Sequence, residues 1–326
     1  MNINEIAKMA GVSASAVSRY LNQGYLSEEK KKRIAEVIEQ TGYVPSTQAQ
    51  MLRTKKTKLI GVIIPKIDSD SISRIVTGIS EVLSGAGYQM ILANTENQAE
   101  KELEYINTFK QNMADGIIHL GTVSTAKHRA AFKSTGIPFV MLGQVQENIS
   151  CIYHDDYHAA VTMTKYVIEK GHQVIGFIGA TAKDKAVGVD RKQGFLDAMV
   201  ESGLPVNEAA VLTGPFSIDN GYQNTSILLD RVPDLDAVIC ATDTIALGAI
   251  KYLNQHNIKI PDQVAVAGFG DSRVSSILMP ALTTIHFYYR ESGVEGAKML
   301  LEKLQNPGIP NKSIKLGFEL IENASV

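Results

Sequence analysis

Polar and charged side chains follow several short apolar runs of the chain, where together they could bind a small molecule. Each run is typical of a buried β-strand, and a donor or acceptor just beyond such a strand lies at the edge of its sheet. The candidates are Asp68, Ser71 and Ile72 after LIGVIIP, Thr242 and Asp243 after AVICA, and Asp271 after VAVAGF. An acidic residue in this position also caps helices, so for Asp243 and Asp156 a helix cap is the favoured alternative.

One further cluster could indicate an enzyme. His154, Asp155 and Asp156 are adjacent and include both metal-ligating and acid–base side chains. We favour the interpretation that they close a strand and begin the next helix. The sequence has no phosphate-binding loop, no Gly-x-Ser-x-Gly elbow and no zinc-like spacing of Cys and His. We therefore expect no catalytic residue, no metal site and no cofactor, although a fold alone does not exclude catalysis.

Short apolar strands alternate with amphipathic helices from Leu59 onward. LIGVIIP, YQMILAN, DGIIHL and PFVML form a first series of strands. A second series begins with a helix from Asp156 to Lys170 and continues with VIGFIG, AVICA and VAVAGF. This alternation predicts an α/β fold of parallel sheets covered by helices on both faces, with enough strands for two lobes. Ligands in such folds bind beyond the carboxyl ends of the strands, where the candidate side chains lie.

The N-terminal residues have a different pattern, which predicts three short helices. Asn2 and Glu5 form a capping box, Gly11 breaks the first helix, and Ser13 caps the second. Two helices joined by a tight glycine turn predict a helix-turn-helix, which places its second helix in the major groove of DNA. A small three-helix bundle that binds protein is the alternative.

The distribution of charge favours DNA as the partner of this head. Residues 1–58 contain ten Lys or Arg and five Asp or Glu, and the rest of the chain contains the other 22 and 29, so that +5 and −7 give the net charge of −2. A basic head on an acidic body is typical of a DNA-binding module attached to another domain. The second helix points these side chains away from its apolar face: Ala14, Ser15, Ser18, Arg19 and Asn22.

The run INEIAKMAGVSASAVSRYLNQGYLSEEKKKRIAEVIEQTGYVPSTQAQMLR resembles the headpiece of the LacI/GalR family of bacterial repressors. The resemblance is carried by AGVSASAVSRYLN, by TGYVPS and by the short segment that follows. It implies that Ala14, Ser15 and Arg19 read base edges and that Ser13 and Asn22 touch phosphates. An Arg can donate two hydrogen bonds to a guanine edge, which makes Arg19 the strongest candidate for base reading.

The same resemblance implies a hinge helix over Ser46–Arg53, a segment that includes Ala49. In the family this helix folds in the minor groove at the centre of the operator. Leu52 matches the leucine that is driven between the central base pairs. An apolar side chain inserted there unstacks a base step and kinks the duplex.

The body resembles the fold of the periplasmic sugar-binding proteins, which the family shares, through RKQGFLDAM, ATDTIALGAI and MPALTTIHF. The resemblance implies that the chain crosses between the lobes near Tyr157, Phe287 and Leu316, with the effector in the cleft between them. Arg191 matches the arginine that holds the effector, and Phe216 matches an aromatic residue that stacks on the ligand ring. A guanidinium fork suits pairs of hydroxyls, and an aromatic face suits the C–H face of a sugar.

The expected organisation is a helix-turn-helix head, a hinge helix with its linker, and a two-lobed core that binds effector and dimerises. One head reads too few base pairs to specify a site, so two chains should bind double-stranded operator DNA as a homodimer. The ranges are 1–45 for the head, 46–58 for the hinge and linker, and 59–326 for the core, with lobe one at about 59–157 and 288–315 and lobe two at about 158–287 and 316–326.

The identity of the effector is less constrained. KTKLIGVIIPKIDSDSISRIV and GFGDSRVS resemble sucrose-operon repressors of Gram-positive bacteria, which implies a sucrose-related or fructose-related sugar, free or phosphorylated. Many relatives place an effector-binding Asp third in a Gly-Tyr-Asp or Gly-Phe-Asp turn, whereas Asp271 comes one position later, after Gly268-Phe269-Gly270. A purine or a phosphorylated carrier protein as corepressor is the alternative. A remote alternative is a sugar-binding protein or an enzyme that has no role on DNA.

Targeting signals are not expected. MNINEIAKMAG lacks the basic and apolar regions of a signal peptide, and no run of about 18 apolar residues indicates a membrane span. Cys151 and Cys240 both lie in apolar runs, which argues against a disulfide framework. We therefore expect a cytoplasmic protein that does not bind membranes.

Overall fold

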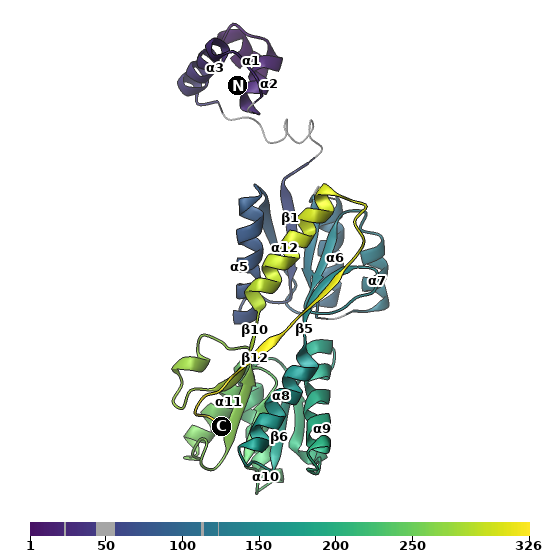
Figure 1. Ribbon diagram of the computed structural model, residues 1–326, viewed down its shortest axis with the longest axis vertical. Helices are drawn as coiled ribbons and strands as arrows, with labels where there is room; N and C mark the ends of the chain where they lie inside the picture. Colours follow the sequence, from purple (N-terminus) through teal and green to yellow (C-terminus); the bar gives the residue numbers. More distant parts are fainter. Residues whose placement is uncertain (23, 44–55, 112–113, 123) are drawn as a thin grey trace. The chain divides into compact units, whose positions relative to one another are not determined.

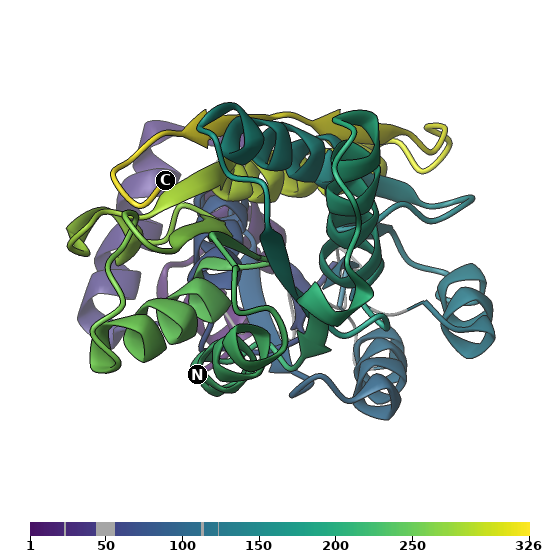
Figure 2. The same ribbon diagram turned by 90° about the horizontal axis from the view of Figure 1, so that it is seen from below.

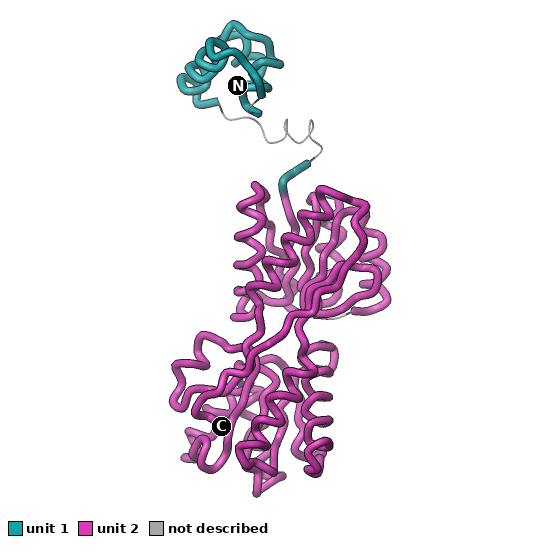
Figure 3. Tube along the Cα trace, viewed as in Figure 1, with its two compact units in different colours: residues 1–58 teal, residues 59–326 magenta. Residues whose placement is uncertain are grey.

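The computed structural model describes residues 1–22, 24–43, 56–111, 114–122 and 124–326. The chain forms two compact units, residues 1–58 and residues 59–326 (Figure 3). No helix in the described part of the chain is both long and apolar enough to cross a membrane.

The first unit contains three helices whose ends are set by local sequence. They are α1 (Ile3–Met9), α2 (Ala14–Leu21) and α3 (Glu28–Thr41). The Asn2 side chain accepts from the backbone N–H of Glu5, and the Glu5 carboxylate accepts from the Asn2 N–H, which completes the expected capping box. Gly11 has a φ of +61°, a left-handed conformation that glycine adopts without strain, and it separates α1 from α2.

The three helices pack around a small apolar core. Ile6, Val17 and Ile34, one from each helix, are fully buried in it. The Arg33 guanidinium of α3 donates to the Gly11 carbonyl at 3.1 Å, which ties the turn between α1 and α2 to the third helix. The opposite face of α2 therefore stays free of the core.

The second unit begins with a six-stranded sheet that forms lobe one. Its order is β11-β5-β4-β3-β1-β2, and every neighbouring pair is parallel. Its strands are β1 (Leu59–Ile64), β2 (Gln89–Asn94), β3 (Gly116–Leu120), β4 (Phe139–Leu142), β5 (Ser150–His154) and β11 (Ser313–Leu316).

Helices cover both faces of this sheet, and two apolar clusters fill the space beneath them (Figure 1). The helices are α5 (Asp70–Gly85), α6 (Ala99–Gln111), α7 (Ala126–Lys133) and α12 (Tyr289–Gln305). α5 and α12 pack closely because glycines lie at their contact. A Cβ at Gly78 would come within 2.1 Å of the Arg290 carbonyl oxygen, and one at Gly293 within 2.1 Å of that of Ile75.

A buried polar cluster joins α6, β3 and α7 on the other face. The Glu102 carboxylate lies 3.1 Å from Nε2 of His119 and 3.2 Å from Nε2 of His128, and all three side chains are buried. Burial alone would raise the pKa of Glu102, but the two histidines outweigh it and lower that pKa to about 2. The carboxylate is therefore ionised and paired at neutral pH.

Lobe two repeats the arrangement with a second six-stranded sheet, in the order β12-β10-β9-β8-β6-β7. The strands are β6 (Ile175–Ala180), β7 (Val211–Gly214), β8 (Ala237–Cys240), β9 (Ala265–Phe269), β10 (Thr283–Phe287) and β12 (Phe318–Ile321). The sheet is parallel, as expected, except that β12 at its edge runs antiparallel to β10. The chain enters β12 directly from β11 of the other lobe, without a crossover helix that would bring it back in the parallel sense.

The helices of lobe two form two packed pairs, α8 with α9 and α10 with α11, around one continuous apolar core. In Figures 1 and 2 the helices of each lobe lie on both sides of its sheet. The elements are α8 (Asp156–Glu169), the π-helix η1 (Lys185–Asp190), α9 (Arg191–Glu201), α10 (Ile218–Arg231) and α11 (Asp243–Gln255), with short 3-10 turns η2 (Glu208–Ala210) and η3 (Ser275–Ile277).

Three segments connect the lobes, between β5 and α8, between β10 and α12, and between β11 and β12. The first of them lies at Asp155, because α8 packs against α9, β10 and β12 of lobe two from its first turn. A boundary at 157 would cut into this helix. The Asp155 backbone N–H donates to the Leu316 carbonyl at 3.1 Å, and the Lys315 ammonium lies 2.8 Å from the Asp155 carboxylate. These bonds tie the first and third connections together.

Candidate effector pocket and DNA-binding face

A pocket lies between the two lobes of the second unit, where the carboxyl ends of both sheets face each other. Its cavity of about 190 Å³ has more than ten times the room that one water molecule needs. Lobe one contributes residues that follow β1, β3, β4 and β5, and lobe two contributes residues that follow β6, β7, β8 and β9. Parallel α/β sheets place their ligands at this edge.

Arg191 begins α9 and lines the pocket, although its side chain is almost wholly buried. Its Nε donates to Oδ1 of Asp156 at 2.8 Å, and its Nη1 donates to the Ala241 carbonyl at 2.7 Å. Phe269 and Phe287 place their ring centroids 5.1 and 4.7 Å from the guanidinium carbon. Burial alone would lower the pKa of Arg191, but Asp156 outweighs it and raises that pKa. The structure thus holds a charged arginine in one fixed orientation.

The three adjacent residues His154, Asp155 and Asp156 point to different partners. His154 packs against the rings of Phe287 and Tyr289, and Asp155 bonds His158 and Lys315 near the surface. Asp156 pairs with Arg191 instead of capping α8. The cluster therefore holds neither a shared metal nor a shared proton, and the described residues include no group of three or more His, Cys, Asp or Glu arranged to hold a metal.

Thr242 and Asp243 line the pocket at the start of α11. The sequence favoured Asp243 as the cap of this helix, but the two residues have different roles. Thr242 is the cap, because its hydroxyl accepts from the Ile245 N–H at 3.2 Å. The Asp243 carboxylate accepts from the Ser272 N–H at 2.7 Å and from the Thr284 hydroxyl at 2.6 Å. The helix-cap interpretation of Asp243 is thus replaced by one in which it fixes the loop after β9. Burial raises the pKa of this carboxyl.

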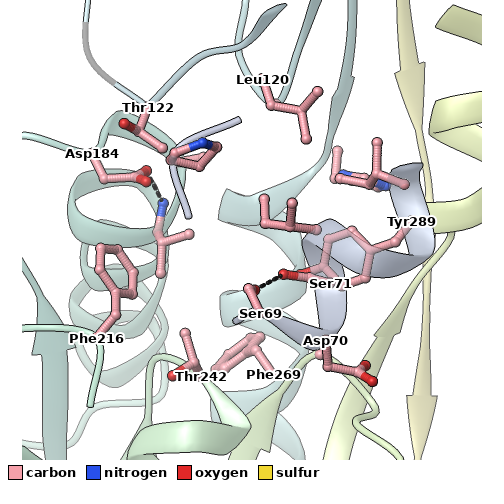
Figure 4. Close-up of a pocket in the computed structure, with 18 of the residues that line it drawn as sticks. Ser69, Asp70, Ser71, Leu120, Thr122, Asp184, Phe216, Thr242, Phe269 and Tyr289 are labelled. Atoms are coloured by element: carbon pink, nitrogen blue, oxygen red, sulfur yellow. Dashed lines mark hydrogen bonds between the residues drawn. The ribbon is translucent and has the colours of Figure 1, made fainter. Parts of the chain in front are cut away.

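An aromatic plate and a hydroxyl-rich segment complete the lining (Figure 4). Phe216 follows β7, and the Lys66 ammonium lies 6.0 Å from the centroid of its ring. Ser69 and Ser71, whose hydroxyls are 3.0 Å apart, lie in the segment after β1, and Ile72 follows them in the lining. An apolar face beside several hydroxyls suits a ligand with both C–H and O–H groups.

Two of the eight predicted effector residues do not line the pocket. Asp68 is exposed to solvent before α5, although Lys66 before it and Ser69 after it line the pocket. Asp271 turns away with a φ of +46°, and its carboxylate bonds Nδ1 of His286 at 2.8 Å. Gly270 and Ser272 on either side of it do line the pocket. Asp271, a candidate effector residue in the sequence, is thus directed to His286 and does not line the pocket in this structure.

Several lining residues were not predicted from the sequence to bind an effector. Asp184 is buried and accepts from the Val187 N–H at 2.9 Å, and burial raises its pKa to about 6 despite the nearby Arg191. His154 ends β5 and Tyr289 begins α12, each next to a connection between the lobes. These residues lie in the pocket because the folded chain brings them together, which their spacing in the sequence does not indicate.

The two lobes also contact each other directly beside the pocket. Arg74 of α5 in lobe one donates through Nη2 to the Gly270 carbonyl in lobe two. The same guanidinium lies 2.9 Å from the Asp70 carboxylate, which is also 3.6 Å from Nε of Arg273 in lobe two. These contacts connect the segment after β1 to the loop after β9, so the separation of the lobes and the shape of the pocket are linked.

In the first unit, the predicted DNA-reading side chains share the outer part of α2. Ser13, Ser15, Arg19 and Asn22 are exposed, and Ala14 and Ser18 are half-buried. Ser13 also caps α2 by accepting from the Ala16 N–H at 3.2 Å, and the Asn22 amide donates to the Ser18 carbonyl. Ala49 and Leu52 of the predicted hinge lie outside the described residues.

Comparison with known proteins defines the class. A family model described as bacterial regulatory proteins of the lacI family matches residues 2–46, and one described as periplasmic binding proteins and the sugar-binding domain of the LacI family matches residues 57–320. The two units correspond to these two matches. The chain belongs to the lacI family of bacterial regulatory proteins, and it is a DNA-binding transcriptional repressor that carries the sugar-binding domain of that family.

Individual relatives match over nearly the full length. The sucrose operon repressor of Staphylococcus xylosus is 31% identical over 96% of this chain and 97% of its own. The transcriptional repressor PurR of Actinobacillus pleuropneumoniae serotype 3 is 32% identical over 93% of this chain and 91% of its own. The structure of a lac repressor dimer bound to operator matches with a TM-score of 0.91, 22% identity and coverage of 100% of this chain and 98% of its own, which shows a shared fold.

Proposed function

We propose that this repressor controls a sucrose-utilisation operon and that a sugar in the pocket between the lobes releases it from operator DNA. The observation that carries the proposal is the pocket itself. Phe216 offers a flat apolar face, and Ser69, Ser71, Thr242 and the buried Arg191 offer hydroxyl and guanidinium groups around it. Sugars are bound by this combination of an aromatic plate and polar groups. The similarity to the Staphylococcus xylosus sucrose operon repressor supports sucrose in particular.

The head supplies the contact with DNA. Arg19 is exposed on the free face of α2, beside Ser15, where a major groove would meet both side chains. A bidentate contact from Arg19 to a guanine would discriminate against other bases by about 1–3 kcal/mol. The excess of positive charge in residues 1–58 adds affinity that does not depend on sequence. Because its DNA partner is chromosomal, we infer that the protein acts in the cytoplasm.

Exposed apolar side chains support a homodimer. Ile91 and Leu92 lie on β2, an edge strand of lobe one, and are 43% and 37% exposed. In lobe two, Ile277 and Met279 are 74% and 92% exposed. Apolar groups exposed in this way mark surfaces that associate with a partner. A second copy would cover them and bring two heads to a near-palindromic operator.

Through the contacts between the lobes, a bound sugar can control operator binding. A ligand that binds both lobes favours one separation of them, and the Arg74–Gly270 and Asp70–Arg273 contacts respond to that separation. The coupling between sugar and operator is reciprocal, and coupling free energies of this kind are about 1–3 kcal/mol. We propose that movement of lobe one changes the spacing of the two hinge segments at 46–53.

A purine corepressor is the second candidate. The similarity to the PurR of Actinobacillus pleuropneumoniae favours it, and an aromatic plate such as Phe216 also suits a purine ring. The two candidates predict opposite responses, because a corepressor strengthens operator binding whereas the proposed sugar weakens it.

A truncation separates repression from a function of the body alone. The protein lacking residues 1–58 retains the whole second unit with its own apolar cores. We expect it to bind sucrose in calorimetry with the affinity of the full chain and to lose operator binding. Retained binding of operator DNA by the truncated protein would contradict the assignment of the head, and loss of sugar binding would contradict the assignment of the pocket.

A further inference from the structure

The charges that line the pocket are arranged in pairs, and this arrangement bears on what the pocket accepts. Asp156 neutralises Arg191 through two contacts to the same oxygen, Nε at 2.8 Å and Nη2 at 2.7 Å. A third N–H bonds the Ala241 carbonyl. A guanidinium has five N–H donors, and Tyr289 is a further hydrogen-bond partner of Arg191, so at most one donor remains for a ligand. A single donor suits a hydroxyl oxygen, whereas a phosphate is held by a free, uncompensated fork.

The second arginine of the lining is neutralised in the same way. Nη2 of Arg74 lies 2.9 Å from the Asp70 carboxylate and donates to the Gly270 carbonyl. The guanidinium carbon lies 5.2 Å from the centroid of the Tyr289 ring. Its charge is therefore compensated by a carboxylate of its own helix, and its orientation is fixed by the contact between the lobes.

The remaining charged groups of the described lining add no arginine that is free to hold an anion. Asp184 and Asp243 are buried carboxylates that face no lysine or arginine within salt-bridge distance among the described residues. Lys66 is the remaining lining cation, and it stands half-exposed beside Phe216. Burial raises the pKa of Asp243 and disfavours its charge, so the other three carboxylates balance the three cations of the described lining, and no arginine is left uncompensated. A phosphate would bring further negative charge next to buried carboxylates without gaining a free arginine.

A buried polar atom points to hydroxyls as the partners instead. The His154 side chain lines the pocket and is 9% exposed, and its Nε2 has no hydrogen-bond partner among the described residues. An imidazole nitrogen without a partner in such a place is unfavourable unless a ligand supplies one. A hydroxyl can serve it in either tautomer, because it both donates and accepts.

We infer that the pocket selects an uncharged, polyhydroxylated ligand and rejects its phosphate ester. This inference rests on the proposed function and narrows it, because it names the free sugar and excludes the sugar phosphate. Asp156 and Asp70 act in specificity by holding the two arginines neutralised. His154, Asp184 and the remaining N–H group of Arg191 are left to bond hydroxyls.

Titration calorimetry on the full-length protein at pH 7.5 and fixed ionic strength tests the inference within matched pairs. The pairs are sucrose and sucrose 6-phosphate, fructose and fructose 6-phosphate, glucose and glucose 6-phosphate, and inosine and inosine monophosphate. We expect the neutral member of one pair to bind at least about 100-fold more tightly than its phosphorylated partner. A phosphorylated member that binds as tightly as its neutral partner, or a panel in which no neutral member binds, would overturn the inference.

A variant changes the charge balance directly. Asp70→Asn removes the carboxylate that compensates Arg74, so it should improve binding of the phosphorylated member of the pair. The ratio of the affinities for the neutral and the phosphorylated ligand should fall about tenfold. Glu81→Gln is the matched control, because Glu81 lies on the same helix α5 and pairs with the exposed Arg290. Discrimination that is unchanged in Asp70→Asn, or reduced equally in Glu81→Gln, would refute the role of the paired arginines.

The panel keeps this inference separate from the proposed function. If inosine binds more tightly than its phosphate while no sugar binds, the sugar proposal fails and the selection of a neutral, polyhydroxylated ligand stands. If a sugar phosphate binds most tightly and releases the operator, the repressor is sugar-controlled and the charge inference fails.

Discussion

Breaking the Asp156–Arg191 pair should destabilise the second unit strongly, because it leaves a buried charge without its counter-ion. In Asp156→Leu the guanidinium of Arg191 keeps the Ala241 carbonyl and the two phenylalanine rings but loses two charge-assisted hydrogen bonds. Such bonds contribute roughly 1.5–3 kcal/mol each. Removing one partner of a buried pair typically destabilises by about 3–5 kcal/mol. We therefore expect the free energy of unfolding to fall by about 4 kcal/mol.

The double variant Asp156→Leu/Arg191→Met should recover part of that loss, because neither charge remains buried. The measurement is urea unfolding followed by far-ultraviolet circular dichroism, since the chain contains no Trp. Asp155→Asn is the control, because Asp155 pairs with a half-exposed lysine, and it should change stability by less than about 1 kcal/mol. If the two single changes add to the double within about 0.5 kcal/mol, the residues are not coupled and the reasoning is refuted.

Three further predictions concern the head, the pocket and a buried cluster. Arg19→Ala should lose about 1–3 kcal/mol of preference for operator over random DNA in competition binding, and equal losses on both would refute base reading. Phe216→Ala should weaken sugar binding in calorimetry at least tenfold without changing operator affinity, and an unchanged affinity for sugar would remove it from the site. The folded pKa of Glu102, about 2, lies below its ordinary 4.5, so its charge contributes stability above about pH 4.5 that is lost as the pH falls toward 2. Glu102→Gln should therefore cost on the order of 3 kcal/mol at pH 7 and much less near pH 2, and a deficit independent of pH would contradict the pairing with His119 and His128.

The fold was predictable from sequence because its signals are local and repeated. The capping box at Asn2, the left-handed turn at Gly11 and the alternation of apolar strands with helices each follow from short-range preferences. The direction of β12 was not predictable in this way. It depends on the direct passage of the chain from β11 in one lobe to β12 in the other, which is a property of the assembled body.

The candidate site was predictable where a residue follows a strand and unpredictable where contacts in space decide. Arg191, Thr242 and Ser71 lie in the lining, as expected from their positions along the chain. Asp271 was misplaced because the backbone turn at Gly270 directs its carboxylate to His286.

The pairing of Asp156 with Arg191 and the hydrogen bond from Arg74 to the Gly270 carbonyl could not be predicted from sequence for the same reason. Asp156 and Arg191 are 35 residues apart, and Arg74 and Gly270 are 196 apart. No periodicity relates them, and only the packing of α8 against α9 and the approach of the two lobes bring them together.

We propose above all that a sugar bound in the second unit controls the affinity of the N-terminal head for operator DNA. Fluorescence anisotropy tests it most directly, with labelled DNA from upstream of the protein's own gene and of neighbouring sugar genes. Salt must be held constant, because phosphate contacts make the affinity steeply dependent on salt. Sucrose, fructose and their phosphates are titrated in. We predict that one free sugar weakens operator binding by about 5- to 150-fold, the range for a coupling of about 1–3 kcal/mol. Operator affinity that no sugar changes, or that is no higher than the affinity for random DNA, would contradict the account.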